Sequence, residues 1–170
     1  MKRFDMIAAS ALFALAAFGL QTTSLAQTVP YSASGANAIF EPGNGDYFGF
    51  GNGLHLGRHS IDGNVIPVGE VFAEPGVFFR GTFSGTQVVT AADGSTLTMT
   101  LNGDVELVFN DQGAAEGMWF PNFEVIDGSG RFEGATGSMS GVAINPPFDP
   151  NAAEWPFDWY IDGTLDLNKR

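Results

Sequence analysis

The fold is decided by residues 77–109, VFFRGTFSGTQVVTAADGSTLTMTLNGDVELVF. From Thr96 to Phe109, apolar side chains occupy every other position, and threonine, asparagine and acidic residues lie between them. A period of two is that of a β-strand with one buried and one solvated face. Residues 77–89 alternate in the same way, and Asp93-Gly94 between the two runs is typical of a hairpin turn. The stretch therefore predicts two antiparallel strands, whose apolar faces carry Phe79, Gly81, Phe83 and Val89 on the first and Leu97, Met99, Leu101, Val105, Leu107 and Phe109 on the second.

The remainder of the chain repeats this pattern. Residues 155–167 alternate aromatic or aliphatic side chains with aspartate, tyrosine and threonine, and glycine or proline recurs every few residues from Gly35 onward, which disfavours helices. Further strands are expected at about 53–62, 65–73, 117–127 and 131–144, with another near 37–41. We therefore predict an all-β protein with a single domain of about eight antiparallel strands over residues 37–170.

Glycines within the expected strands indicate how the sheet closes. Gly81, Gly103 and Gly163 stand at strand-interior positions, and residues 128–138, GSGRFEGATGS, carry four glycines in eleven residues. Glycine inside a strand marks a bend, a bulge or a close backbone approach, so we interpret 128–138 as a strand bending round a small barrel. The pattern favours a closed antiparallel β-barrel; a two-sheet β-sandwich is the alternative.

The first 36 residues are expected to lie outside the barrel. Lys2 and Arg3 precede an apolar run, and the small residues Ser24 and Ala26 fit a signal peptidase site, so residues 1–26 are interpreted as a signal peptide cleaved near Ala26. The protein would then be secreted or periplasmic, without a membrane span. Residues 27–36, rich in serine, threonine and glycine, are predicted to be a flexible N-terminal lead. A second irregular segment, 145–151, contains three prolines and is predicted to be a loop.

Composition excludes several kinds of partner and site. The chain has no cysteine, so no disulfide can form and stability must come from a packed core. The net charge of −12 disfavours nucleic acid and anionic membranes as partners. His55 and His59 would lie about 13 Å apart on a strand, too far to share one metal ion. No metal site and no cofactor is predicted, and no catalytic residue can be nominated.

Aromatic residues are the main candidates for a site. In a small barrel, inward aromatic side chains either fill the interior or line a pocket for one apolar molecule. The inventory on the expected inner face is Phe79, Phe83, Trp119, Phe123, Phe157 and Trp159.

Two stretches, Leu54-His-Leu-Gly-Arg58 and Gly128-Ser-Gly-Arg-Phe-Glu-Gly-Ala-Thr-Gly137, together resemble a group of secreted bacterial proteins related to the allene oxide cyclase barrel and the plant dirigent proteins. The resemblance implies an eight-stranded antiparallel barrel whose cavity holds a hydrophobic, oxygenated small molecule and steers its cyclisation or coupling without a cofactor. It also implies a homo-oligomer, with trimer and dimer both open. No residue here matches the catalytic positions of those families.

These observations favour a secreted, cofactor-free β-barrel that binds an apolar, oxygenated small molecule. The expected ligand-binding residues are the six aromatic side chains above together with His55. One alternative is an isomerase or cyclase of the allene oxide cyclase type, in which His55 or an acidic side chain moves a proton. The other is a structural or surface-associated protein with a filled barrel, which would expose a large apolar patch.

Overall fold

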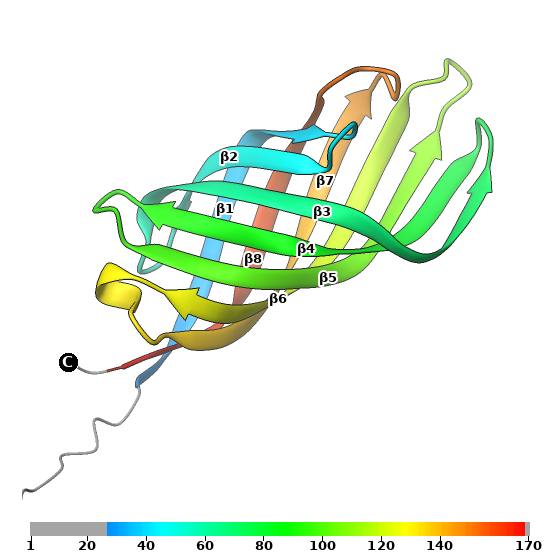
Figure 1. Cartoon of the computed structure of the whole chain (residues 1–170). Coiled ribbons are helices and arrows are strands. Elements are labelled where there is room, and N and C mark those ends of the chain that lie inside the picture. The colour runs from blue at the N-terminus through cyan, green and yellow to red at the C-terminus, as the bar shows by residue number, and fades with distance from the viewer. Residues whose placement is uncertain (1–26, 169–170) are drawn as a thin grey trace, which may run out of the picture.

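The computed structural model describes residues 27–168, which form one closed, antiparallel β-barrel (Figure 1). Each strand pairs with the next along the chain, and β8 returns to pair with β1. The predicted barrel is confirmed and the sandwich alternative is wrong. The proposed signal peptide, 1–26, lies outside the described residues. The elements are β1 (Gln27–Glu41), β2 (Asp46–Gly53), β3 (Gly57–Glu74), β4 (Phe78–Ala91), β5 (Thr96–Phe109), β6 (Ala115–Gly128), the short 3₁₀ helix η1 (Gly130–Phe132), β7 (Thr136–Phe148) and β8 (Trp155–Leu167).

The N-terminal lead predicted at 27–36 is wrong, because these residues belong to β1. Gln27 to Gly35 pair one by one with β8, from Leu167 to Trp159. Val29, Tyr31 and Ala33 face inward and are buried, and the residues between them are more exposed. The serine-rich composition concealed this alternation. Closure of the barrel depends on β1, since it supplies the partner for the last strand.

Three other boundaries differ from the expected ones. The strands predicted at 53–62 and 65–73 are one strand, β3, which curves past a bulge between Val68 and Phe72. The glycine-rich β2 was not predicted. Strand β7 continues to Phe148, so the first part of the loop predicted at 145–151 is sheet, and Asn145 is buried.

Most of the glycine-rich stretch 128–138 is a turn and not a bent strand: residues 129–135 lie between β6 and β7, and Thr136 to Ser138 begin β7. Gly128 ends β6, η1 follows, and Gly130 and Gly134 adopt φ angles of 61° and 71°, the left-handed region that glycine tolerates best. Between them Phe132 is 2% exposed and belongs to the core cluster. The stretch therefore folds back over one end of the barrel.

This end is closed by contacts among three turns. Arg131 Nη1 lies 3.2 Å from Asp93 Oδ2 in the β4–β5 turn, and its Nη2 donates a hydrogen bond of 3.2 Å to the carbonyl of Leu56 in the β2–β3 turn. The Leu56 side chain is buried beside this contact in the same core cluster as Phe132. Both ends of the described chain also lie here (Figure 1).

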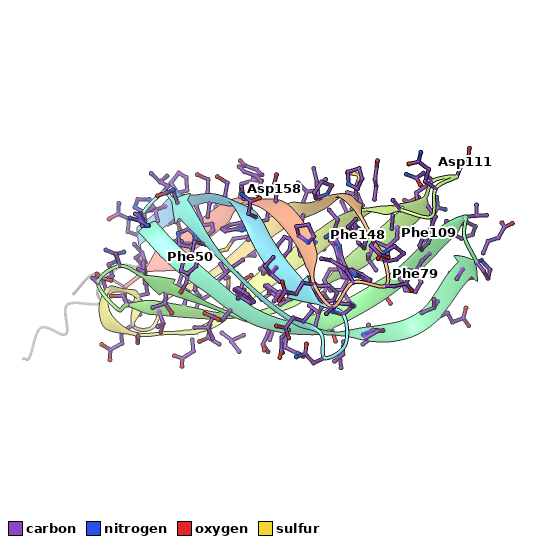
Figure 2. All side chains as sticks on the ribbon, turned by 90° about the horizontal axis from the view of Figure 1, so that it is seen from above. Phe50, Phe79, Phe109, Asp111, Phe148 and Asp158 are labelled. Carbon is purple, nitrogen blue, oxygen red and sulfur yellow. The ribbon has the colours of Figure 1, made fainter. Side chains whose placement is uncertain are left out.

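The opposite end is open and asymmetric. Strand β2 begins at Asp46, opposite Asn64, so β3 beyond residue 65 pairs with β4 alone. The β3–β4 and β5–β6 hairpins consequently project beyond β1 and β2 (Figure 1). Figure 2 shows Phe79, Phe109 and Phe148 in this half of the molecule. Their side chains give the open end an aromatic lining.

Candidate functional site

The barrel interior contains a cavity of about 70 Å³. Every strand contributes to its wall, because the alternation of each strand directs one row of side chains inward. The wall is mainly apolar, and its polar side chains are Tyr47, Gln87 and Asn145, together with the indoles of two tryptophans. The lining residues are Phe40, Tyr47, Ile61, Val65, Phe83, Gln87, Leu101, Trp119, Pro121, Phe123, Val142, Ala143, Asn145, Phe157, Trp159 and Ile161.

Five of the predicted site residues meet at this cavity. They are Phe83, Trp119, Phe123, Phe157 and Trp159. Their role in ligand binding stays a prediction.

The other two predicted site residues lie elsewhere. Phe79 is half-buried toward the open end, in register with Ala73 and Leu107 (Figure 2). The placement of His55 inside the barrel was wrong: His55 is exposed in the β2–β3 turn, with a φ of 66°. The turn breaks the alternation between the two strands, so counting by twos through it assigned the wrong face.

An aromatic column leads from the open end to the cavity. Phe148 packs on Trp155 with ring centroids 4.7 Å apart, and Trp155 packs on Phe40 at 5.5 Å. Phe40 in turn contacts Trp119 at 5.2 Å, and Trp119 meets Phe83 edge to face at 5.2 Å. Tilted and edge-on pairs of this kind are favourable beyond their burial. The column fixes the rings of the cavity wall in place.

Tyr47 and Gln87 form a polar pair within the apolar wall. The Tyr47 hydroxyl donates a hydrogen bond of 3.0 Å to Gln87 Oε1, and both residues are buried. Burial raises the pKa of Tyr47 far above its ordinary value, so the phenol remains protonated and able to donate. Gly63 lies between them in the sheet, paired with Tyr47 on one side and Gln87 on the other. A Cβ at residue 63 would stand 2.2 Å from the Tyr47 ring, so glycine there lets the ring reach across to Gln87.

Asn145 holds a second polar position in the wall. It is 1% exposed, accepts a hydrogen bond of 2.7 Å from Trp119 Nε1 at Oδ1, and donates one of 2.8 Å from Nδ2 to the Pro156 carbonyl. The amide thereby fixes the Trp119 indole. Sequence analysis missed Asn145 because the two prolines after it predicted a loop.

His59, not His55, is the histidine inside the barrel. It is 4% exposed, and its Nδ1 lies 3.0 Å from the Gly57 carbonyl, which requires Nδ1 to carry the proton. Burial lowers the pKa of His59, and this bond partly offsets the shift. Its ring packs edge-on against Trp159 at 5.7 Å, outside the cavity wall. The imidazole is therefore a neutral packing group with an unpartnered Nε2.

The cavity wall determines what chemistry the site can perform. None of its side chains is a carboxylate, an amine or an imidazole, so the wall itself offers no group that exchanges a proton near neutral pH. Within residues 27–168, no group of three or more histidine, cysteine or acidic side chains is placed to hold a metal ion, and no helix is long and apolar enough to cross a bilayer. The wall can surround an apolar molecule and offer it hydrogen bonds.

Comparisons of the chain with protein-family models, with curated proteins and with solved structures find no match. Function must therefore be argued from the geometry of the barrel interior.

Proposed function

We propose that this protein binds a small, apolar, oxygen-containing molecule inside its β-barrel. The supporting observation is the cavity of about 70 Å³, enclosed by side chains from all eight strands and lined chiefly by aromatic and aliphatic groups. A concave, mostly apolar wall with a few polar atoms is the usual form of a small-molecule site.

The volume limits the size of the ligand. Sites for drug-sized molecules measure roughly 300–1,000 Å³, and a dry engineered cavity of about 150 Å³ holds benzene. A cavity of about 70 Å³ accepts a molecule with few non-hydrogen atoms unless its wall moves. Long-chain lipids and phenolic dimers are therefore disfavoured as ligands.

The proposal is tested by adding acetone, whose four non-hydrogen atoms suit the volume of the cavity, to the purified, ¹⁵N-labelled protein and following its indole N–H resonances. Saturable shifts are expected for Trp119 and Trp159, whose rings line the cavity. Ala143→Leu should abolish saturation because the larger side chain fills the cavity, whereas Ala153→Leu, at an exposed position between β7 and β8, should behave like the wild type. The proposal would be refuted if the wild-type shifts rise linearly without saturation, or if Ala143→Leu shows the same saturable shifts as the wild type.

Binding is preferred to the isomerase or cyclase alternative because of the wall chemistry. In that alternative, His55 or an acidic side chain inside the cavity moves a proton beside the substrate. The lining lacks a carboxylate and an imidazole, and His55, the histidine considered for this role, is exposed in a turn.

A second candidate function, association between copies of the chain, is favoured by the outer face. Phe72 is 61% exposed and Phe120 is 43% exposed, and both line the same surface hollow. Neighbouring exposed apolar side chains of this kind are typical of interaction surfaces. Sedimentation of the wild type and of Phe72→Ser tests association between copies. A dimer or trimer that the substitution dissociates supports association, and a monomer in both proteins contradicts it.

We also propose that the protein is exported with residues 1–26 removed. The support is the pattern of Lys2, Arg3 and the following apolar run, and cleavage after Ala26 would leave all of β1 intact. The mass of the exported protein should correspond to a start near Gln27. A start well before residue 24, or retention of the leader in a membrane fraction, would contradict this.

A further inference from the structure

We infer that Gln87 selects the ligand by donating a hydrogen bond, so that the bound molecule carries a neutral acceptor oxygen such as that of a ketone, an ester or an ether. This inference rests on the proposed function and specifies its ligand class. It is carried by the polar atoms of the cavity wall that have no partner.

The unpartnered polar atoms of the wall are all donors. Gln87 is 2% exposed and its Nε2 has no hydrogen-bond partner, and the same is true of the Nε1 of Trp159, which is 6% exposed. Both amide oxygens of the wall are in use: Gln87 Oε1 accepts from Tyr47, and Asn145 Oδ1 accepts from Trp119. Leaving a buried donor unpaired is costly, so the interior is complementary to a group that only accepts.

The orientation of the Gln87 amide follows from Tyr47. A protonated phenol needs an acceptor, and Oε1 at 3.0 Å provides one. Exchanging the amide oxygen and nitrogen would leave the phenol proton and the amide oxygen both without partners. The pair therefore directs Nε2, with its two hydrogens, away from Tyr47.

The ligand must also be neutral. The wall contains no arginine, lysine or histidine, so a carboxylate would enter without a counter-charge. Burying an unpaired ion in an apolar site costs far more than one hydrogen bond returns. A hydrocarbon of the same shape fits the wall but leaves the donors unpaired. The neutral oxygen acceptor is the class that avoids both penalties.

The test compares acetone with propane, which has the same three-carbon skeleton without the oxygen, by titration into the labelled protein. The wild type should bind the ketone about three- to tenfold more tightly, the range expected for one hydrogen bond. The Gln87 side-chain amide resonance, identified by its loss in Gln87→Met, should shift with the ketone only. Gln87→Met should remove the preference while retaining propane binding, and Gln112→Met, at an exposed position in the β5–β6 turn, should leave the preference unchanged.

Tyr47→Phe provides a second variant, because it removes the hydroxyl that orients Gln87 and keeps the ring. It should reduce the preference for the ketone and leave the propane affinity close to that of the wild type. Circular dichroism confirms that each variant is folded.

The outcomes separate the inference from the proposed function. If the wild type binds the ketone and the hydrocarbon equally and the Gln87 resonance does not move, the role of Gln87 is overturned and small-molecule binding still stands. This result is expected where an ordered water alone satisfies the Gln87 amide. Saturable binding of neither molecule would overturn both.

Discussion

Aromatic rings inside this barrel lie over glycines of neighbouring strands. The Trp159 ring occupies the space that a Cβ at Gly35 or Gly51 would need, with separations of 2.5 and 2.6 Å, and the Tyr47 ring does the same at Gly63. A narrow barrel can hold large rings only where the facing backbone carries no side chain. These glycines are therefore packing positions first and flexible positions second.

Gly63→Ala should displace the Tyr47 ring and break its hydrogen bond to Gln87. The added methyl would stand 2.2 Å from the ring, so the ring must move or the strand must shift. We expect a loss of about 1–3 kcal/mol in the free energy of unfolding, typical of overpacking in a core. Urea melts measure this, with Gly43→Ala as the control, because nothing lies within 4 Å of a Cβ there. Equal midpoints for both variants would show that the ring is not held over Gly63.

His59 should make the barrel less stable as the pH falls below about 6.5. Burial holds the pKa of the folded-state imidazole below the ordinary value of 6.5. Between these two pKa values the unfolded chain binds a proton that the folded chain does not, so the free energy of unfolding falls as the pH decreases. The effect is complete once the pH is below the folded-state pKa.

The measurement compares unfolding free energies at pH 7.5 and 5.5. His59→Phe should show a smaller decrease than the wild type, since it removes the titrating group and keeps a ring beside Trp159. His55→Asn, at the exposed turn position, should keep the wild-type decrease. A decrease of the same size in His59→Phe would assign the acid sensitivity to other groups.

At the scale of single residues, the alternation of apolar and polar side chains was the sequence signal that predicted which residues face inward. It placed Phe83 and Trp159 correctly. The same count extends to Gln87, two positions before Val89, but the sequence analysis did not single out this buried glutamine. It failed for His55 because the turn between two strands resets the count. Which inward side chains enclose the cavity depends on the stagger of strands around the barrel, and no single strand contains that information.

At the scale of elements, strands with regular alternation were predicted and those with irregular composition were not. Strands β4, β5, β6 and β8 were predicted to within three residues at each end. Residues 27–36 of β1 were mistaken for a flexible lead, although the strand predicted near 37–41 lies in β1. Residues 129–135, interpreted as part of a bent strand, form a turn. In this segment, the positive φ angles of Gly130 and Gly134 and the burial of Phe132 make a turn that fits over the barrel end. Arg131 holds this turn to the barrel end through its contacts with Asp93 and Leu56, and the sequence of the turn alone does not reveal these tertiary contacts.

Substituting valine for Gly134 or Gly137 should destabilise the fold by about 1–3 kcal/mol. Gly134 has a φ of 71°, which valine adopts poorly, and a Cβ on Gly137 would lie 2.4 Å from the backbone oxygen of Thr164. Thr98→Val and Thr100→Val should be nearly neutral, because these side chains lie on the outer face of β5. Urea melts of the four variants decide the matter, and indistinguishable midpoints would remove the steric argument.

At the scale of the whole molecule, the sequence predicted a closed sheet but did not reveal which strand closes it. The sequence indicated about eight antiparallel strands, but a barrel also requires the first strand to pair with the last. Here that seam joins β1 to β8 through nearly the whole length of both strands. The seam buries Tyr31 to 2% exposure. Because β1 pairs with both β2 and β8, the sheet has no open edge at this place in the described chain.

Deleting residues 27–36 from a chain that begins at Gln27 tests the seam. The deletion removes the partners of residues 159–167 in β8 and exposes the inner face beside Leu165, which is fully buried in the intact barrel. We expect loss of cooperative unfolding in urea and association through the newly exposed strand edges, because unpaired backbone groups of a long apolar strand recruit other strands. The matched chain that begins at Gln27 and lacks only residues 1–26 should unfold cooperatively and keep all eight strands. If the two chains instead unfold at the same urea concentration, residues 27–36 would be the dispensable lead that their composition predicted, and the barrel would have to close without them.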